Sequence, residues 1–363
     1  MLDFELDEEQ KMLVAAIGRY SESQVRKVYR DADEDGLIPP EVTSAGWEFG
    51  LLPTGIPEAY GGFGEYSAVT GALAMEEFAY GDLAVALEIG VPGLVALPLM
   101  LSGTEEQRAG YLPAFCGDSA PRVSAALVEP LVQFDPRALQ TSAVRDGESY
   151  VLNGVKCQVP LAEGAETFLI YANEDGRTQA FLVPADSAGL EVGQREKLMG
   201  IRALPTYGLT LAECRVPEAN KVGGEAGIDF DVILNHSRVA LGAAAVGVAR
   251  AGYEYARDYA KERQQFGEPI AHRQSIAFML AEMAIEVDAA RLMVWEAAWK
   301  LDRDEDATEE ATVMKYFVDN MVLQVADRAV QTLGGYGYIR EYPVELWLRN
   351  ARGFATFDGL AMV

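Results

Sequence analysis

Residue types that carry metal, thiol or triad chemistry are scarce in this sequence. The two histidines, His236 and His272, are too few for a His-rich metal site, and neither a CxxC nor an HExxH pattern is present. The three cysteines, Cys116, Cys157 and Cys214, are odd in number and far apart, which argues against a disulfide framework and favours a reducing compartment. Metal catalysis and a Ser-His-Asp triad are therefore poorly supported.

The excess of acidic over basic residues bears on which partners the protein could bind. The 363 residues include 30 Lys and Arg against 56 Asp and Glu, a formal charge of −26. Because a nucleic acid is bound through clustered Lys and Arg, this balance argues against a nucleic-acid partner. The N-terminus lacks the positive start and apolar run of a secretory signal, and no uninterrupted apolar stretch reaches the roughly 20 residues of a membrane span. We expect a cytoplasmic protein without a membrane span.

The elements that must position an active site fall into three zones, and the first is helical. It runs from Leu6 to about Cys116. Glu8 to Arg26 is amphipathic, whereas Ser67 to Tyr80 and Asp82 to Leu101 are mostly apolar. Thr104, followed by two glutamates, is typical of a helix N-cap with acidic residues in its first turn.

The second zone has the residue pattern of β-strands, and the third has that of helices. Between about Val123 and Val222, short β-branched and aromatic runs alternate with Asp-Gly or Asn-Gly pairs, which predicts a small antiparallel β domain with tight turns at Asp146-Gly147, Asn153-Gly154 and Asp175-Gly176. From Gly227 onward, long apolar helices return, and Gly334-Gly335 marks the end of one of them.

Strings along nearly the whole chain resemble the acyl-CoA dehydrogenase family. In order they are Pro57 to Gly62, Gly103 to Gln107, Glu129-Pro130, Leu152 to Gly154, Met199 to Arg202, Arg263 to Gly267, Gln331 to Gly337 and Glu341 to Pro343. The resemblance implies an α+β fold with an N-terminal helical domain, a middle antiparallel β domain and a C-terminal four-helix bundle. We place these domains at residues 1–120, 121–224 and 225–363.

The resemblance also implies a chemistry. Family members use FAD to oxidise a CoA thioester to its α,β-enoyl form, usually as a tetramer, with an electron-transfer flavoprotein as acceptor. A carboxylate removes the α-proton while the β-hydride goes to the flavin, so base, thioester and ring must lie in line. One chain holds the flavin ring mostly with its β domain, and a neighbouring chain's helices hold the diphosphate and adenine.

The set of residues that faces the neighbour's cofactor is largely present. Arg263 and Phe266 match the family's Arg-x-x-Phe-Gly, whose cation meets the FAD diphosphate. Gln274 occupies the position of a family glutamine, and Gln331 with Gly334 and Gly335 matches the stretch where backbone approaches the cofactor. As a spaced set these six residues predict cofactor binding; singly, Arg263 reads as a surface ion pair and the glycines as a helix C-cap.

The set that faces the flavin ring departs from the family pattern. The family has an aromatic residue and Thr before Glu-Pro and Gly-x-Gly-Ser-Asp after it, whereas this chain has Ala125, Val128 and then residues 131–135, LVQFD. The family's Trp-Ile-Ser/Thr reads Gln158-Val159-Pro160, which replaces a ring-facing hydroxyl with a proline that has no N–H donor.

The catalytic position is altered as well. Asp358 stands where the family commonly places the catalytic Glu, and its carboxylate starts roughly 1.5 Å further back. A displacement of about 1 Å can cost about 10²-fold in rate. Leu360 replaces a cofactor-contacting hydroxyl, and the alternative base position is Ser237, next to Arg238, which matches an arginine near the CoA phosphopantetheine. His236 is adjacent in sequence but is expected to be structural.

Three hypotheses follow. The preferred one is a partner subunit of a heteromeric acyl-CoA dehydrogenase, which completes the FAD site of a catalytic chain; by analogy such enzymes act on bulky thioesters such as sterol side chains. The second is a self-sufficient homotetramer that uses Asp358 as its base. The third is a redox-inert CoA-binding subunit. The residues do not reveal the acyl chain.

Overall fold

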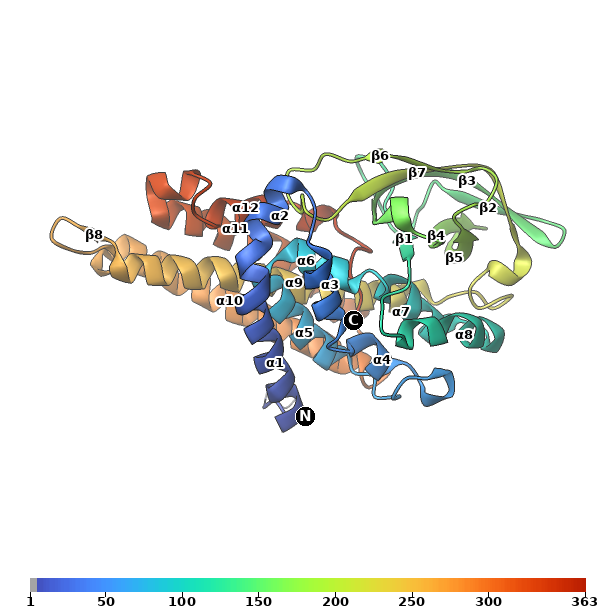
Figure 1. Ribbon diagram of the computed structural model, residues 1–363, viewed down its shortest axis with the longest axis horizontal. Helices are drawn as coiled ribbons and strands as arrows, with labels where there is room; N and C mark the ends of the chain where they lie inside the picture. Colours follow the sequence, from blue (N-terminus) through green and yellow to red (C-terminus); the bar gives the residue numbers. More distant parts are fainter. Residues whose placement is uncertain (1–4) are drawn as a thin grey trace.

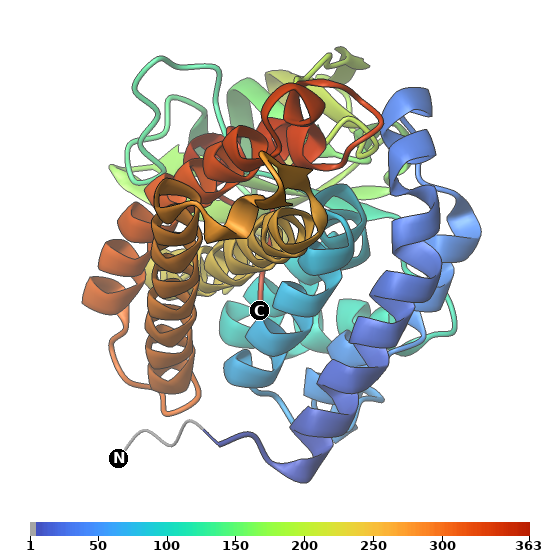
Figure 2. The ribbon, with the colours of Figure 1, turned by 90° about the vertical axis from the view of Figure 1, so that its left-hand side faces the viewer.

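The computed structural model describes residues 5–363. Figure 1 shows a curled sheet at one end of the molecule and long helices that extend away from it, with the N-terminal helices packed against both. Turned by 90°, the N-terminal helices lie side by side with the long C-terminal helices (Figure 2). The order helices, sheet, helices matches the sequence-based prediction.

From residue 5 onward, the N-terminal region contains eight α-helices: α1 Glu8–Tyr20, α2 Arg26–Asp35, α3 Pro40–Trp47, α4 Leu51–Gly55, α5 Ala68–Gly81, α6 Leu83–Gly90, α7 Gly93–Ser102 and α8 Glu105–Tyr111. Thr104 caps α8 with two glutamates in its first turn, as predicted, and both Asp7 and Thr104 also form a capping box with a glutamine three residues later. The apolar run from Asp82 to Leu101 is not one helix, because it breaks at Val91-Pro92 into α6 and α7.

The middle region is a seven-stranded sheet, in the order β1-β4-β2-β3-β7-β6, with β5 paired to β4. Its strands are β1 Val123–Ala126, β2 Ser142–Asp146, β3 Ser149–Pro160, β4 Thr167–Glu174, β5 Arg177–Pro184, β6 Leu190–Arg195 and β7 Thr206–Pro217. Most pairs are antiparallel, as expected, but β1 runs parallel to β4 and β2 meets β4 in parallel. A hairpin joins β2 to β3 at Asp146-Gly147, and another joins β4 to β5 at Asp175-Gly176.

The prediction of a turn at Asn153-Gly154 is wrong. Both residues lie inside β3, where a register shift marks a bulge against β7. The Asn153 side chain bonds Glu213 of β7 through both its amide nitrogen (2.9 Å) and its oxygen (2.8 Å). A Cβ on Gly154 would stand 2.5 Å from Thr141, so glycine permits a close strand approach rather than a reversal of the chain.

The C-terminal region is built on three long helices: α9 Phe230–Glu262, α10 Gln274–Leu301 and α11 Thr308–Leu333. The fourth helix, α12 Val344–Ala351, is short. A small hairpin of β8 Gln264–Gln265 and β9 Glu268–Pro269 lies at the far tip, and α11 ends at Leu333 before Gly334, as predicted.

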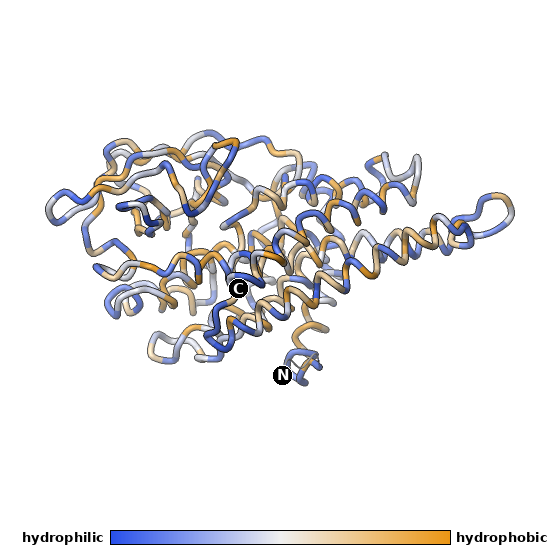
Figure 3. Tube along the Cα trace, turned by 180° about the vertical axis from the view of Figure 1, so that it is seen from behind, coloured by the Kyte–Doolittle hydropathy of each residue, from blue (hydrophilic) through white to orange (hydrophobic). Residues whose placement is uncertain are grey.

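The core runs along α9. Apolar residues recur along the length of the long helices (Figure 3). By length and composition α9 could cross a membrane, but 89% of its most apolar window is buried inside the protein, so other elements already cover its apolar faces. A Cβ on Gly247 of α9 would stand 2.3 Å from the Glu76 carbonyl oxygen of α5, which shows how closely these two helices approach.

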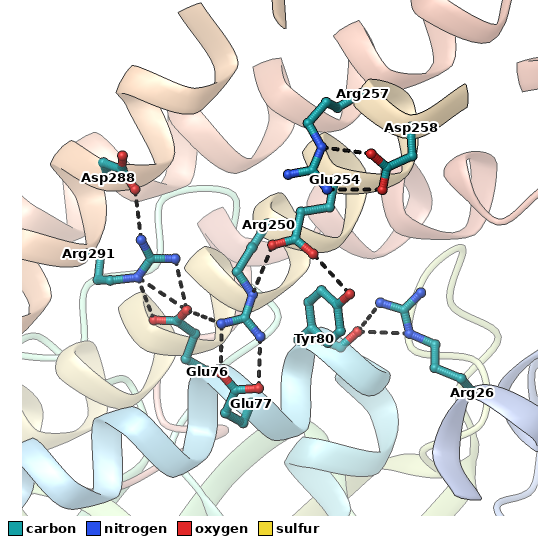
Figure 4. Close-up of polar contacts among 10 residues, drawn as sticks. All are labelled: Arg26, Glu76, Glu77, Tyr80, Arg250, Glu254, Arg257, Asp258, Asp288 and Arg291. Carbon is teal, nitrogen blue, oxygen red and sulfur yellow. Dashed lines mark hydrogen bonds and ion pairs between the residues drawn. The ribbon is translucent and has the colours of Figure 1, made fainter. Parts of the chain in front are cut away.

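A charged network joins α5, α9 and α10 beside this core (Figure 4). Glu76 and Glu77 of α5 are buried, and Arg250 of α9 donates to both carboxylates at 2.7 Å. Arg291 of α10 donates to Glu76 at 3.0 Å and to Asp288 at 2.8 Å. Because two arginines neutralise the two glutamates, the network fixes the N-terminal helices on the bundle without an uncompensated buried charge.

Candidate cofactor and catalytic sites

A cavity of about 480 Å³ lies at the end of α9, opposite the end of α11. Arg263 follows α9 directly and forms part of its wall, and Gly334 and Gly335 follow α11 directly and form another part. The remaining lining residues are Tyr259, Gln265, Ile270, Ile276, Thr332, Leu333, Tyr336 and Ile339. Among these described residues Arg263 alone carries a charge, so the cavity is apolar-walled with one cation.

The two glycines leave the wall of this cavity open. Gly334 has φ +59°, in the left-handed region that glycine adopts without strain. A Cβ added to either Gly334 or Gly335 would meet no atom within 4 Å and would therefore project into open space. Bare backbone beside one guanidinium fits a dinucleotide diphosphate, which needs close backbone approach and a cation.

The other predicted cofactor residues lie near this cavity but outside its lining. Gln331 is exposed on the last turn of α11. Phe266 is 92% exposed in the turn of the β8–β9 hairpin, beneath the guanidinium of Arg273. Gln274 is exposed as the first residue of α10. Within this chain, the structure therefore brings Arg263, Gly334 and Gly335 together and leaves the other three on the adjoining surface.

Asp358, in the C-terminal segment, lies close enough to Arg238 of α9 to influence its charge. Asp358 is half-buried, and its Oδ1 is buried without a hydrogen-bond partner among the described residues. Arg238 donates to Thr312 Oγ1 at 2.8 Å, while its Nε is likewise buried without a partner there. Burial lowers the pKa of Arg238, although the nearby Asp358 carboxylate acts in the opposite direction.

Ser237 serves a structural purpose here. It is buried, and its Oγ accepts a hydrogen bond from the backbone N–H of Gly359 at 3.1 Å. Serine has no carboxylate and cannot act as a carboxylate base. Its hydroxyl instead fastens the segment after Asp358 to α9.

Sequence reasoning missed Lys315 and Asp319, which support the segment that carries Asp358. Lys315 of α11 donates to the Phe354 carbonyl at 2.9 Å and to Asp319 at 2.6 Å. Burial raises the pKa of Asp319, although Lys315 works against the shift. Their i,i+4 spacing on a predicted helix is the signal that could have identified them as a pair.

This chain's own side chains fill the space between the Asp358 segment and the β domain. Leu127 and Val128 are buried, as are Phe357 and Leu360. A Cβ on Gly359 would stand 2.8 Å from Leu127, so backbone and side chain are already in contact.

The cavity beside Gln158 and Phe357 measures about 140 Å³, well below the roughly 300–1,000 Å³ of ligand pockets. This half of the site does not fit a flavin ring.

A buried ion pair joins β3 to the segment that follows β1. Lys156 is fully buried, and its Nζ donates to the Leu127 carbonyl at 3.0 Å and to Glu129 Oε1 at 2.9 Å. Glu129 also accepts from the backbone of Gln140 and Thr141 at 2.7 and 2.8 Å. Although burial opposes its charged form, Lys156 and these bonds hold the pKa of Glu129 below its ordinary value.

His236 is structural, as expected. It is buried, and its Nδ1 lies 2.6 Å from the Val363 carbonyl oxygen and 2.8 Å from the Tyr66 hydroxyl. Burial lowers the pKa of His236 to about 4, so the ring is neutral at pH 7. In the described part of the chain, the three cysteines are free and no group of three His, Cys, Asp or Glu side chains could hold a metal ion.

A further cavity of about 220 Å³ lies among the N-terminal helices. Its lining is mostly apolar, and of the described residues in it none belongs to the predicted site.

Comparisons with known proteins match the chain over its whole length. Family models for the acyl-CoA dehydrogenase N-terminal, middle and C-terminal domains match residues 7–118, 124–214 and 230–362. A probable acyl-CoA dehydrogenase of Bacillus subtilis, YngJ, is 36% identical over 100% of this chain and 97% of its own length.

Two further relatives extend the comparison. The caffeyl-CoA reductase-Etf complex subunit CarC of Acetobacterium woodii is 34% identical over 98% of this chain and 96% of its own. The solved butyryl-CoA dehydrogenase of Megasphaera elsdenii superposes with a TM-score of 0.89 at 29% identity, covering 99% of this chain and 96% of that one.

Proposed function

The chain belongs to the acyl-CoA dehydrogenase family of flavin-dependent oxidoreductases, and from this premise we propose that it is a partner subunit in a heteromeric acyl-CoA dehydrogenase. Its helical tip would complete the FAD site of a catalytic chain. The observation that carries the proposal is a contrast between two parts of the expected FAD site. The cavity beside Arg263, proposed for the diphosphate, is open, whereas the space proposed for the flavin ring is filled by Leu127, Gly359 and Leu360. In a homotetramer both halves would be needed in every chain.

The chain's own residues have simple tasks in this arrangement. Arg263 would hold the FAD diphosphate with its planar N–H donors, and the bare backbone at Gly334 and Gly335 would approach the same group. The flavin, when bound, supplies the acceptor for the β-hydride of the thioester. Proton removal would fall to a carboxylate of the catalytic chain, and Asp358 of this chain would stay outside the reaction.

One observation favours the homotetramer as the second candidate. Asp358 Oδ1 is buried without a partner among residues 5–363, as a base waiting for a substrate proton would be. In that reading Asp358 removes the α-proton, Arg238 opposite it contacts the CoA thioester, and the Leu127–Gly359 contact must open before substrate enters. A redox-inert CoA-binding subunit is the third reading.

The flavin content of the purified chain separates these readings. The chain is purified alone and after co-expression with dehydrogenase-like chains from its genomic neighbourhood, and the FAD-to-protein ratio is measured. We expect no flavin alone and about one FAD per two chains in the complex. About one FAD per chain alone would favour the homotetramer, and no flavin with any partner would favour the redox-inert subunit.

The Arg263→Ala variant tests the diphosphate contact. We expect the assembled complex to lose flavin on gel filtration, because the cation of the cavity has gone. Arg257→Ala is the matched control, since Arg257 lies on the same helix end and pairs with Asp258 at 2.8 Å. Flavin retention equal to the wild type in the Arg263 variant would contradict the proposal.

The Asp358→Ala and Asp358→Asn variants test the two catalytic readings. In the heteromeric reading, turnover of the complex stays close to that of the wild type in both. A loss of several orders of magnitude in both variants would establish Asp358 as the base.

Three further features belong to the same proposal. Electron-transfer flavoprotein is the acceptor that the family and CarC, named as a subunit of an Etf complex, support. A bulky acyl chain, such as a sterol side chain, remains the proposed substrate class by analogy. A cytoplasmic location is proposed from the reduced cysteines and acidic charge.

A further inference from the structure

The guanidinium of Arg263 is unpaired in a chain rich in carboxylates. Neighbouring arginines have carboxylate partners: Arg257 pairs with Asp258 at 2.8 Å, and Arg273 pairs with Glu268 at 3.0 Å. Across residues 5–363, by contrast, no carboxylate lies within 4.0 Å of Arg263. The guanidinium of Arg263 instead lies over an aromatic ring: its Cζ is 5.1 Å from the centroid of the Tyr336 ring, a cation–π distance.

Tyr336 is itself held by other aromatic residues. Its ring lies 5.3 Å from that of Tyr342, which lies 6.3 Å from that of Tyr259. The Tyr342 carbonyl accepts from Arg30 of α2 at 3.1 Å, and the Tyr259 carbonyl accepts from the backbone N–H of Arg263 at 2.8 Å. The last backbone bond of α9 therefore fixes where the Arg263 side chain starts, and the Tyr336 ring, supported by Tyr342, lies against its guanidinium.

The cavity gives this orientation a use. Arg263, Tyr336 and Tyr259 all line it, together with the open backbone at Gly334. A ring face beside a guanidinium contacts the cation without using its N–H donors, whereas a carboxylate would consume them. The donors remain available to an anion that enters the cavity.

We propose that Tyr336 is a positioning residue that holds the Arg263 guanidinium ready for the FAD diphosphate delivered by a neighbouring chain. The proposal rests on the proposed function, because it assumes that the cavity takes that diphosphate. An unrestrained arginine loses rotamer freedom when it binds an anion, and the ring of Tyr336 beside the guanidinium removes part of that loss beforehand.

The experiment measures the FAD dissociation constant of the assembled complex by flavin fluorescence. Tyr336→Leu should weaken FAD binding about two- to fivefold, the change that a cation–π contact at an exposed site supports. Tyr336→Phe should bind FAD like the wild type, because the ring is kept and only the hydroxyl is removed. Tyr338→Leu is the matched control, since Tyr338 is 87% exposed and absent from the cavity lining.

The double variant separates positioning from a general structural effect. In the Arg263→Ala background, Tyr336→Leu should produce no further loss, because its effect passes through the guanidinium. An equal additional loss in that background would overturn the inference while leaving the proposed function standing. If Arg263→Ala itself leaves FAD binding unchanged, the proposed function and this inference fail together.

Discussion

Replacing Lys156 by Met should destabilise the β domain by about 3–5 kcal/mol, the cost of removing one partner from a buried ion pair. The side chains of Lys156 and Glu129 are 0% and 2% exposed, so water cannot replace the lost ammonium. The variant leaves the Glu129 carboxylate with its two backbone donors and the Leu127 carbonyl without the Lys156 donor.

The loss should depend on pH in a defined direction. Burial is already the largest influence on Glu129, and Lys156 is the strongest of the groups that oppose it; without Lys156 we expect the folded pKa of Glu129 to rise above its ordinary value of 4.5. The folded variant then binds a proton more readily than the unfolded chain, so its stability falls as pH rises through that window. The deficit relative to the wild type should therefore be larger at pH 8 than at pH 5.

The assay is urea unfolding followed by circular dichroism, with hydrogen exchange of β3 and β7 amides as the local probe. The Glu129→Gln, Lys156→Met double variant should recover part of the loss, because it removes the unpaired charge and keeps an amide oxygen for the backbone donors. Lys11→Met is the control, since its partner Glu8 is exposed and the pair contributes little. A Lys156 variant as stable as the wild type, or equally destabilised at both pH values, would refute the reasoning.

Two further predictions concern pH and have opposite signs. Burial raises the pKa of Glu88 to about 7, so the native protein keeps this proton to higher pH than the unfolded chain does, and stability falls as pH rises from about 4.5 to 7. The Glu88→Gln variant should lack that fall and have a higher urea midpoint than the wild type at pH 8. An unchanged dependence of the midpoint on pH would contradict this prediction. Burial lowers the pKa of His236 to about 4, so the unfolded chain binds a proton at higher pH than the native protein does. The free energy of unfolding should therefore fall by about 3 kcal/mol as pH drops from about 6.5 to 4. The His236→Gln variant should show a smaller fall over this range, and a slope as steep as that of the wild type would count against a neutral buried imidazole. The flavin retention of Arg263→Ala and the turnover of Asp358→Ala complete the set, with the outcomes given above.

Much of the fold follows from local chemistry that the sequence displays. The Thr104 capping box needs only a hydroxyl and a glutamine three residues later, and the turns at Asp146-Gly147 and Asp175-Gly176 need only residues that tolerate positive φ. Asn153-Gly154 has the same composition and failed as a turn prediction, because Glu213 and Thr141 approach it from distant parts of the chain. A dipeptide carries no information about such neighbours.

For the candidate site too, some features could be predicted from the sequence and others depend on tertiary packing. The order and spacing of residue types identified the family. They also showed that Asp358 and Pro160 differ from the family pattern, whereas Arg263, Gly334 and Gly335 match it. They did not identify Tyr336 or Lys315, because both act on groups brought to them by packing: a guanidinium at the end of α9 and the Phe354 carbonyl beyond α12. The sequence by itself determined which chemical groups are available. Only the tertiary structure decided that the cavity beside Arg263 is open and that the space between Leu127 and Gly359 is filled. Both depend on the volume left between segments that are far apart in the sequence; Leu127 and Gly359 are more than 200 residues apart.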